Sequence, residues 1–255
     1  MRLAHYAALA IAVATAAGAQ ERAGKPMPQC IAPAAWYTLE TGGPRRADAQ
    51  ALLRDMSQRQ VVLLGEQHDS AEDHAWQLQT LAALHLMRPQ LVIGFESFPR
   101  RVQPVLDRWI AGELSARQFL EQTEWDKVWR FPPALYMPLF EFARLNRIPM
   151  IALNVERTLT EAVGARGWDA VPAAQREGVS RAAPPPAAYL DTLYEVFLAH
   201  GNSDPAGSAT GHQDATGKHR ASRDDPAFRR FVESQTTWDR AMAEALAGRA
   251  HAPGG

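Results

Sequence analysis

The chain has 255 residues, 46% of them hydrophobic, and a formal net charge of −1. This length gives room for one sizeable domain with a substantial core. The near-neutral charge argues against a nucleic-acid binder, which would be basic, and the single cysteine excludes an internal disulfide.

Residues 1–19 have the features of a secretory signal peptide. Arg2 supplies a positive charge, residues 7–17 are apolar, and Ala17-Gly18-Ala19 fits an A-x-A cleavage site. The apolar run is too short to span a bilayer, and no later segment is long and apolar enough. We therefore expect an exported, periplasmic protein that is soluble after cleavage, with no transmembrane segment in the mature chain.

The next part of the chain leads to a buried strand. Residues 20–35 contain three prolines and predict an extended lead-in. Residues 36–39 predict a short edge strand before a turn at 41–44, and residues 47–59 predict a helix. The apolar run at 61–64 then predicts a strand of a parallel sheet, buried on both faces.

Acid and base side chains follow this run directly. Glu66 and His68 come within four residues of its end, and ligands in open α/β sheets bind at the carboxyl ends of strands. We therefore expect both residues to face a ligand. Ser70, with Asp73 three residues later, predicts the capped start of a helix that Pro89 ends.

Two further strands are expected to end at the same edge. Residues 91–95 precede Glu96, and residues 150–153 precede Asn154. Because long connections between strands imply parallel pairing, these two polar residues are expected beside Glu66. Between these strands we expect helices at 103–112 and 115–121. A third helix is expected to have Pro138 in its first turn and Tyr136 just before its start.

The predicted fold class is α/β, with a parallel sheet flanked by helices and a smaller helical subdomain. The expected parts are a core domain at 36–164, a helical subdomain at 165–200, a flexible polar loop at 201–226 and a helix at 227–247 that returns to the core. Three strands make a thin sheet, so we also expect a sequence that is truncated at its C-terminus.

The last of these helices carries two polar residues on its apolar side. The apolar stripe consists of Phe228, Val232, Met242 and Leu246. Gln235 and Asp239 fall near its centre, and buried polar groups are costly without partners. We expect both to bond to groups at the strand ends.

Glu66, His68 and Glu96 allow two kinds of chemistry. A histidine with two carboxylates suits a Zn, Mn or Fe site, and the same groups suit a general acid/base pair. A purely structural role, bonding loop amides beyond the strand, is the third option.

An ordered set of segments resembles one known family. These segments are Gly65-Glu66-Gln67-His68-Asp69, Gly94-Phe95-Glu96 followed by Gln103, Trp125 through Trp129, Tyr136-Met137-Pro138-Leu139, Ala152-Leu153-Asn154 and Gln235-Thr236-Thr237-Trp238-Asp239. Together they resemble the ChaN family of haem-binding uptake proteins, within the Tiki superfamily. The resemblance implies an exported parallel α/β protein with a smaller helical domain. Its relatives usually continue into a strand with a Gly-x-Gly-His-like end, which nothing after Gly248 supplies.

The resemblance implies haem as a cofactor. Tyr136 is the leading candidate for the axial ligand of the iron, since tyrosine is one of the side chains that hold haem. The alternative for Tyr136 is a packing role at the start of its helix. Trp125, Trp129 and Phe131 are expected to contact the ring. Asn154 is expected among the cofactor-binding residues, and Arg157 is expected to meet a propionate or another carboxylate. The alternative ligands are Tyr189, Tyr194, His212 and His219.

The leading hypothesis is an exported haem- or iron-binding protein that serves in haem or iron uptake. The main alternative is a periplasmic metal-dependent hydrolase or protease that uses Glu66, His68 and Glu96 with a divalent metal ion. A non-catalytic scaffold is the weaker alternative. Gln235 and Asp239 would orient the site, and the expected partners are a haem or iron source, with a homodimer as an option and no nucleic acid.

Overall fold

The computed structural model describes residues 32, 35–201 and 222–250. The predicted signal peptide, nearly all of the lead-in and most of the 201–226 loop, including His212 and His219, lie outside the described residues. Within the described helices, none is long and apolar enough to cross a membrane. The chain divides into two compact units, Met1–Leu52 and Leu53–Gly255.

The first unit contains a β-hairpin. Strand β1 (Tyr37–Glu40) pairs antiparallel with β2 (Gly43–Arg46), which confirms the predicted short strand and narrows the turn to two residues. Gly43 has a φ of +108°, a conformation that glycine adopts without steric cost. Helix α1 (Ala49–Ser57) follows and runs from the first unit into the second.

The second unit is built on a parallel pair of strands. Strand β3 (Ile93–Pro99) pairs in parallel with β4 (Met150–Asn154), as predicted, with Ile93 opposite Met150. The connection between them contains the helices α3 (Gln103–Ala111), α4 (Ala116–Gln122), α5 (Trp125–Val128) and α6 (Pro133–Leu145). Helix α2 (Ala71–Met87) precedes β3 and packs against α6.

Aromatic rings form the core between the strands and the connecting helices. Phe98, Phe119 and Phe140 have no solvent exposure and contact one another edge-on or tilted, at centroid distances of 5.3–5.8 Å. The indole N–H of Trp109 donates to the Phe140 carbonyl at 3.0 Å. This bond satisfies a polar group that is buried among the aromatic rings, where an unpaired N–H would be costly.

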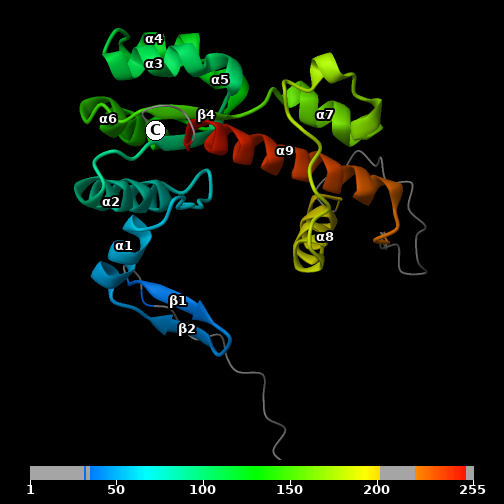
Figure 1. Cartoon of the computed structure of the whole chain (residues 1–255), viewed down its shortest axis with the longest axis horizontal. Coiled ribbons are helices and arrows are strands. Elements are labelled where there is room, and N and C mark those ends of the chain that lie inside the picture. Colours follow the sequence, from blue (N-terminus) through cyan, green and yellow to red (C-terminus); the bar gives the residue numbers. More distant parts are fainter. Residues whose placement is uncertain (1–31, 33–34, 202–221, 251–255) are drawn as a thin grey trace, which may run out of the picture. The chain divides into compact units, whose positions relative to one another are not determined.

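A helical part follows β4. It consists of α7 (Arg157–Arg166), two short 3₁₀ turns (Trp168–Ala170 and Ala173–Gln175), α8 (Ala187–Gly201) and α9 (Pro226–Ala250). Helix α9 packs against β4 and α7, and Figure 1 shows its length spanning from the strands to α7 and α8. The most buried residues of α9 are Phe228, Thr237 and Ala241, so its inner face differs from the predicted stripe, whose other members are only half-buried.

The predicted strand at 61–64 is wrong. This segment forms no strand with the described residues, and its side chains alternate between exposed and half-buried, with Leu63 82% exposed. An apolar run shows β-propensity, but a strand exists only where a neighbour supplies the ladder of hydrogen bonds.

The predicted start of α6 is also wrong. The helix begins at Pro133, five residues before Pro138, which lies inside it. Proline suits the first turn of a helix because its missing N–H has no partner there, and the earlier proline takes that position. Tyr136 consequently lies within the first turn of α6 and points into the core.

Candidate functional site

Glu66 is the centre of a polar cluster that follows the apolar residues 61–64. Its Oε1 lies 2.9 Å from Nδ1 of His68 and accepts the hydroxyl hydrogen of Tyr136 at 2.7 Å. Its Oε2 lies 2.9 Å from Nε2 of His74, a close contact that does not have the geometry of a hydrogen bond. Both oxygens of this carboxylate are therefore engaged by neighbouring side chains.

The start of α2 holds this segment in place. The Ser70 hydroxyl caps the helix by accepting from the Asp73 N–H at 3.2 Å, as predicted. Asp73 in turn accepts from the Gln67 N–H at 2.7 Å, and Gln77 donates to the Leu64 carbonyl at 2.9 Å. The first two turns of α2 therefore help to position the segment that carries Glu66 and His68.

His74 is a site residue that the sequence did not indicate. Its side chain is only 4% exposed, and its Nδ1 lies 2.6 Å from the Ser70 carbonyl. In the sequence, His74 is a single histidine in the first turn of α2. A single histidine in a helix does not by itself indicate a functional site. Its contact with Glu66 requires the helix to be docked.

His68 presents the exposed ring of the cluster. Its side chain is 39% exposed, compared with 13% for Glu66. The ring meets Trp129 edge-on at a centroid distance of 4.8 Å and lies 5.0 Å from the ring of Phe131. No residue in the described part of the chain forms a hydrogen bond with its Nε2.

Tyr136 and Trp125 lie in the core. Tyr136 is 3% exposed, and its ring meets His74 edge-on at 4.3 Å. Burial, followed by the hydrogen bond to Glu66, raises the pKa of the Tyr136 hydroxyl well above its usual value. Trp125 is buried as well and donates to the Phe131 carbonyl at 2.8 Å.

Glu96 and Asn154 lie on the neighbouring strands β3 and β4. Asn154 donates from its amide to the Glu96 carbonyl at 2.9 Å, while its side-chain oxygen accepts from the Val155 N–H. Burial raises the pKa of the Glu96 carboxyl; the charge of His68 opposes this, and the negative charges of Glu66 and Asp239 add to it. Glu96 therefore lies close enough to His68, Glu66 and Asp239 for their charges to act on its carboxyl group.

Helix α9 contributes Asp239 to this cluster. Asp239 accepts the hydroxyl hydrogen of Tyr189, on α8, at 2.8 Å. Burial and this hydrogen bond raise the pKa of Tyr189 to about 12. Gln235 is half-buried one turn earlier, and none of the described residues forms a hydrogen bond with its side chain.

The remaining predicted residues lie apart from these contacts. Arg157 is ion-paired with Glu161 on the surface of α7, at 2.7 Å. Tyr194 packs its ring against Phe228 at a centroid distance of 5.2 Å.

Comparison with known proteins decides the family. The family model described as "Haem-binding uptake, Tiki superfamily, ChaN" matches residues 52–255. The chain belongs to this family. A solved structure described as cofacial haem binding to ChaN of Campylobacter jejuni has the same fold, with a TM-score of 0.56. It is 17% identical in sequence, and the match covers 84% of this chain and 76% of that one. No curated protein sequence matches the chain.

A divalent metal ion and haem need different sets of donor groups. Among the described residues, no three histidine, cysteine, aspartate or glutamate side chains are placed to hold a metal ion. Haem requires less of the protein: one axial ligand and an apolar surface for the macrocycle. His68 between Trp129 and Phe131 fits that requirement.

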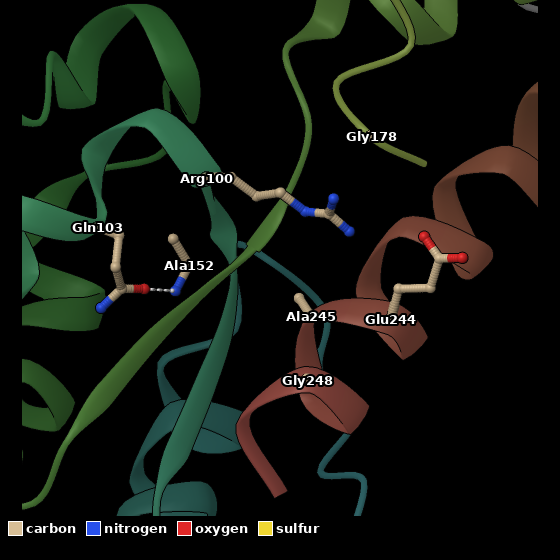
Figure 2. Close-up of a pocket in the computed structure, with 7 residues that line it drawn as sticks. All are labelled: Arg100, Gln103, Ala152, Gly178, Glu244, Ala245 and Gly248. Carbon is tan, nitrogen blue, oxygen red and sulfur yellow. Dashed lines mark hydrogen bonds between the residues drawn. The ribbon is translucent and has the colours of Figure 1, made fainter. Parts of the chain in front are cut away.

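A separate hollow of about 500 Å³ lies between β4 and the end of α9 (Figure 2). Arg100 points into it and donates to the carbonyls of Ala241 at 2.6 Å and Glu177 at 3.2 Å. Gln103 bridges the edge of β4, donating to the Met150 carbonyl and accepting from the Ala152 N–H, each at 2.8 Å. The residues that line this hollow are all different from those of the cluster around Glu66.

Proposed function

We propose that this ChaN-family chain binds haem against His68 and the flanking rings of Trp129 and Phe131. The observation that carries the proposal is the exposed His68 ring, whose Nδ1 is held by Glu66 while its Nε2 has no hydrogen-bond partner among the described residues. The neighbouring aromatic rings offer the apolar contact that a porphyrin needs.

The site we propose differs from the predicted one in its contact residues. Trp129 stays at the haem surface, while Tyr136 and Trp125 support it from the core, where both are almost fully buried. Arg157, paired with Glu161, has no part in this proposal.

A role in haem or iron uptake after export forms the wider part of the proposal. It rests on the signal-peptide pattern of residues 1–19 and on membership of a family described as haem-binding uptake proteins. Cofacial haem binding, described for the Campylobacter jejuni ChaN, suggests two haems facing each other, so we include a haem-linked homodimer in the proposal.

Hemin titration of the chain lacking residues 1–19 tests the binding function. We expect a saturable shift of the Soret band, and Trp129→Ala should weaken the affinity about tenfold through the loss of ring contacts. Hemin also adheres to exposed apolar groups, so Leu145→Ala, on an exposed leucine of α6, serves as the control and should bind like wild type. A shift that never saturates, or equal losses in both variants, would contradict the proposal.

Light scattering of the same samples, with and without hemin, tests the homodimer. Cell fractionation of the full chain, compared with a chain lacking residues 1–19, tests export. A full chain that stays in the cytoplasm would remove the uptake role but not the binding function.

A further inference from the structure

We propose that the C-terminal ends of α2 and α6 form a surface that docks on a bilayer containing anionic phospholipid. The inference does not depend on haem binding, because it concerns the ends of these helices that lie away from the cluster around Glu66. Its basis is a group of exposed apolar side chains beside arginines that form no ion pair with the described residues.

The sheet brings the ends of the two helices to one edge. Helix α2 leads into β3 and α6 leads into β4 through short connections, at residues 88–92 and 146–149. Strands β3 and β4 are parallel, and the Ile93 N–H at the start of β3 donates to the Pro149 carbonyl at 2.9 Å. Both helices therefore end at the edge of the sheet where the strands begin.

Large apolar side chains are exposed around this edge. They are Leu86, Met87, Val92 and Leu145, with exposed fractions of 84%, 41%, 37% and 79%. The rings of His85 and Phe142 meet edge-on at a centroid distance of 6.0 Å, so the two helices touch within three residues of the exposed leucines. Single exposed apolar residues are ordinary, but a group of them at one place indicates a binding surface.

The carboxylate-free connections at this edge are basic. Residues 84–92 and 142–149 contain Arg88, Arg144 and Arg147 and no aspartate or glutamate. Arg88 donates to the Ser57 carbonyl at 2.9 Å, and the Arg144 guanidinium lies 4.3 Å from the centre of the Trp109 ring. Arg147 is exposed, and none of the three forms an ion pair with the described residues. Their positive charges are therefore available to an anionic partner.

An anionic bilayer suits both properties of this surface. Lipid phosphates attract arginine, while leucine and methionine side chains reach the boundary of the acyl chains. A helix C-terminus favours basic side chains by itself, but that effect gives no reason for leucine and methionine to stay exposed beside them. A two-fold contact between two copies of this edge would place arginines against arginines. The charges therefore favour lipid over a second copy of the chain.

Docking at this edge leaves the candidate haem surface open. His74 and Tyr136 lie in the first turns of α2 and α6, so the cluster around Glu66 is at the opposite ends of these helices. Helix α2 has 17 residues and is about 25 Å long. The exposed ring of His68 is therefore well separated from the proposed lipid contact.

Co-sedimentation with lipid vesicles tests the proposal, using the chain without residues 1–19, whose own apolar run would bind lipid. We expect binding to vesicles of phosphatidylcholine with phosphatidylglycerol, and binding about tenfold weaker to phosphatidylcholine alone. Leu86→Ser combined with Leu145→Ser should weaken partition into the anionic vesicles by about tenfold or more, since two apolar contacts are lost. Arg88→Gln combined with Arg147→Gln should remove most of the preference for anionic vesicles.

Matched controls come from the β-hairpin. Leu39→Ser removes a leucine that is 87% exposed, and Arg46→Gln removes an exposed arginine of β2. Both should bind vesicles like wild type, and urea unfolding should give the same midpoint for all variants, because every substituted side chain is exposed. Equal losses in Leu39→Ser and the double leucine variant would overturn the proposal.

Two further results would also overturn it. One is equal binding of wild type to the two kinds of vesicle. The other is a wild-type chain that ignores vesicles but forms a haem-free dimer in light scattering, which the double leucine variant disperses; the surface would then be a protein interface. Hemin titration of the double leucine variant should match wild type, so failure of lipid docking and failure of haem binding are separate outcomes.

Discussion

The hydroxyl of Tyr136 donates to Oε1 of Glu66 across 70 residues of sequence, at 2.7 Å. This bond joins the first turn of α6 to the loop before α2, two parts of the chain that no local signal connects. It also commits the hydrogen of Tyr136 to Glu66 and leaves His68 as the exposed ring of the cluster.

Tyr136→Phe should lower the free energy of unfolding. The change removes a hydrogen bond to a nearly buried carboxylate but keeps the ring that packs against His74 and Phe140. Hydrogen bonds to charged groups contribute about 1.5–3 kcal/mol, so we expect a loss of that size in urea unfolding. Tyr189→Phe, which removes a less buried bond to Asp239, is the control and should cost less. Equal stability of Tyr136→Phe and wild type would show that the bond contributes nothing.

Glu96→Gln should stabilise the haem-free protein at neutral pH. Burial and the charges of Glu66 and Asp239 raise the pKa of Glu96 in the folded chain above the usual 4.5. A raised folded pKa means that stability is complete below the unfolded pKa and is lost as pH rises through the folded pKa. At pH 7 wild type has lost this part of its folding stability, whereas the glutamine variant, which has no carboxyl group to ionise, has not.

The check is a pair of urea unfolding curves, at pH 7 and near pH 4. The stability gain of Glu96→Gln over wild type should be present at pH 7 and shrink at the lower pH. A gain that is the same at both pH values would point to packing and not to the ionisation of Glu96.

Gly94→Ala should destabilise the strand pair. A Cβ at this position would lie 2.8 Å from Cδ1 and 2.9 Å from Cδ2 of Leu153 on β4, closer than van der Waals contact permits. Overpacking of this kind costs about 1–3 kcal/mol. Gly65→Ala is the matched control, because nothing lies within 4 Å of its added Cβ, and it should change the unfolding free energy by less than about 0.5 kcal/mol. Similar effects at the two glycines would contradict the close packing of the Leu153 side chain on Gly94.

Local patterns predicted much of the fold. The cap of α2 by Ser70, the strand before Asn154 and the parallel pairing of β3 with β4 all agree with the structure. Each of these features has its cause within a few residues, or in a rule of connection that holds for most folds. The predictions at 61–64 and at Pro138 failed because propensity does not tell whether a strand finds a neighbour or which of two prolines starts a helix.

The candidate site divides in the same way. The sequence by itself determined that Glu66 and His68 follow an apolar segment, and that their motif and those after it belong to one family. Only the tertiary structure decided that Tyr136 is buried and bonded, that His74 contacts Glu66, and that His68 remains exposed. The physical reason is that exposure and hydrogen-bond partners depend on the packing of α2 and α6 against each other, and residues far apart in the chain determine that packing.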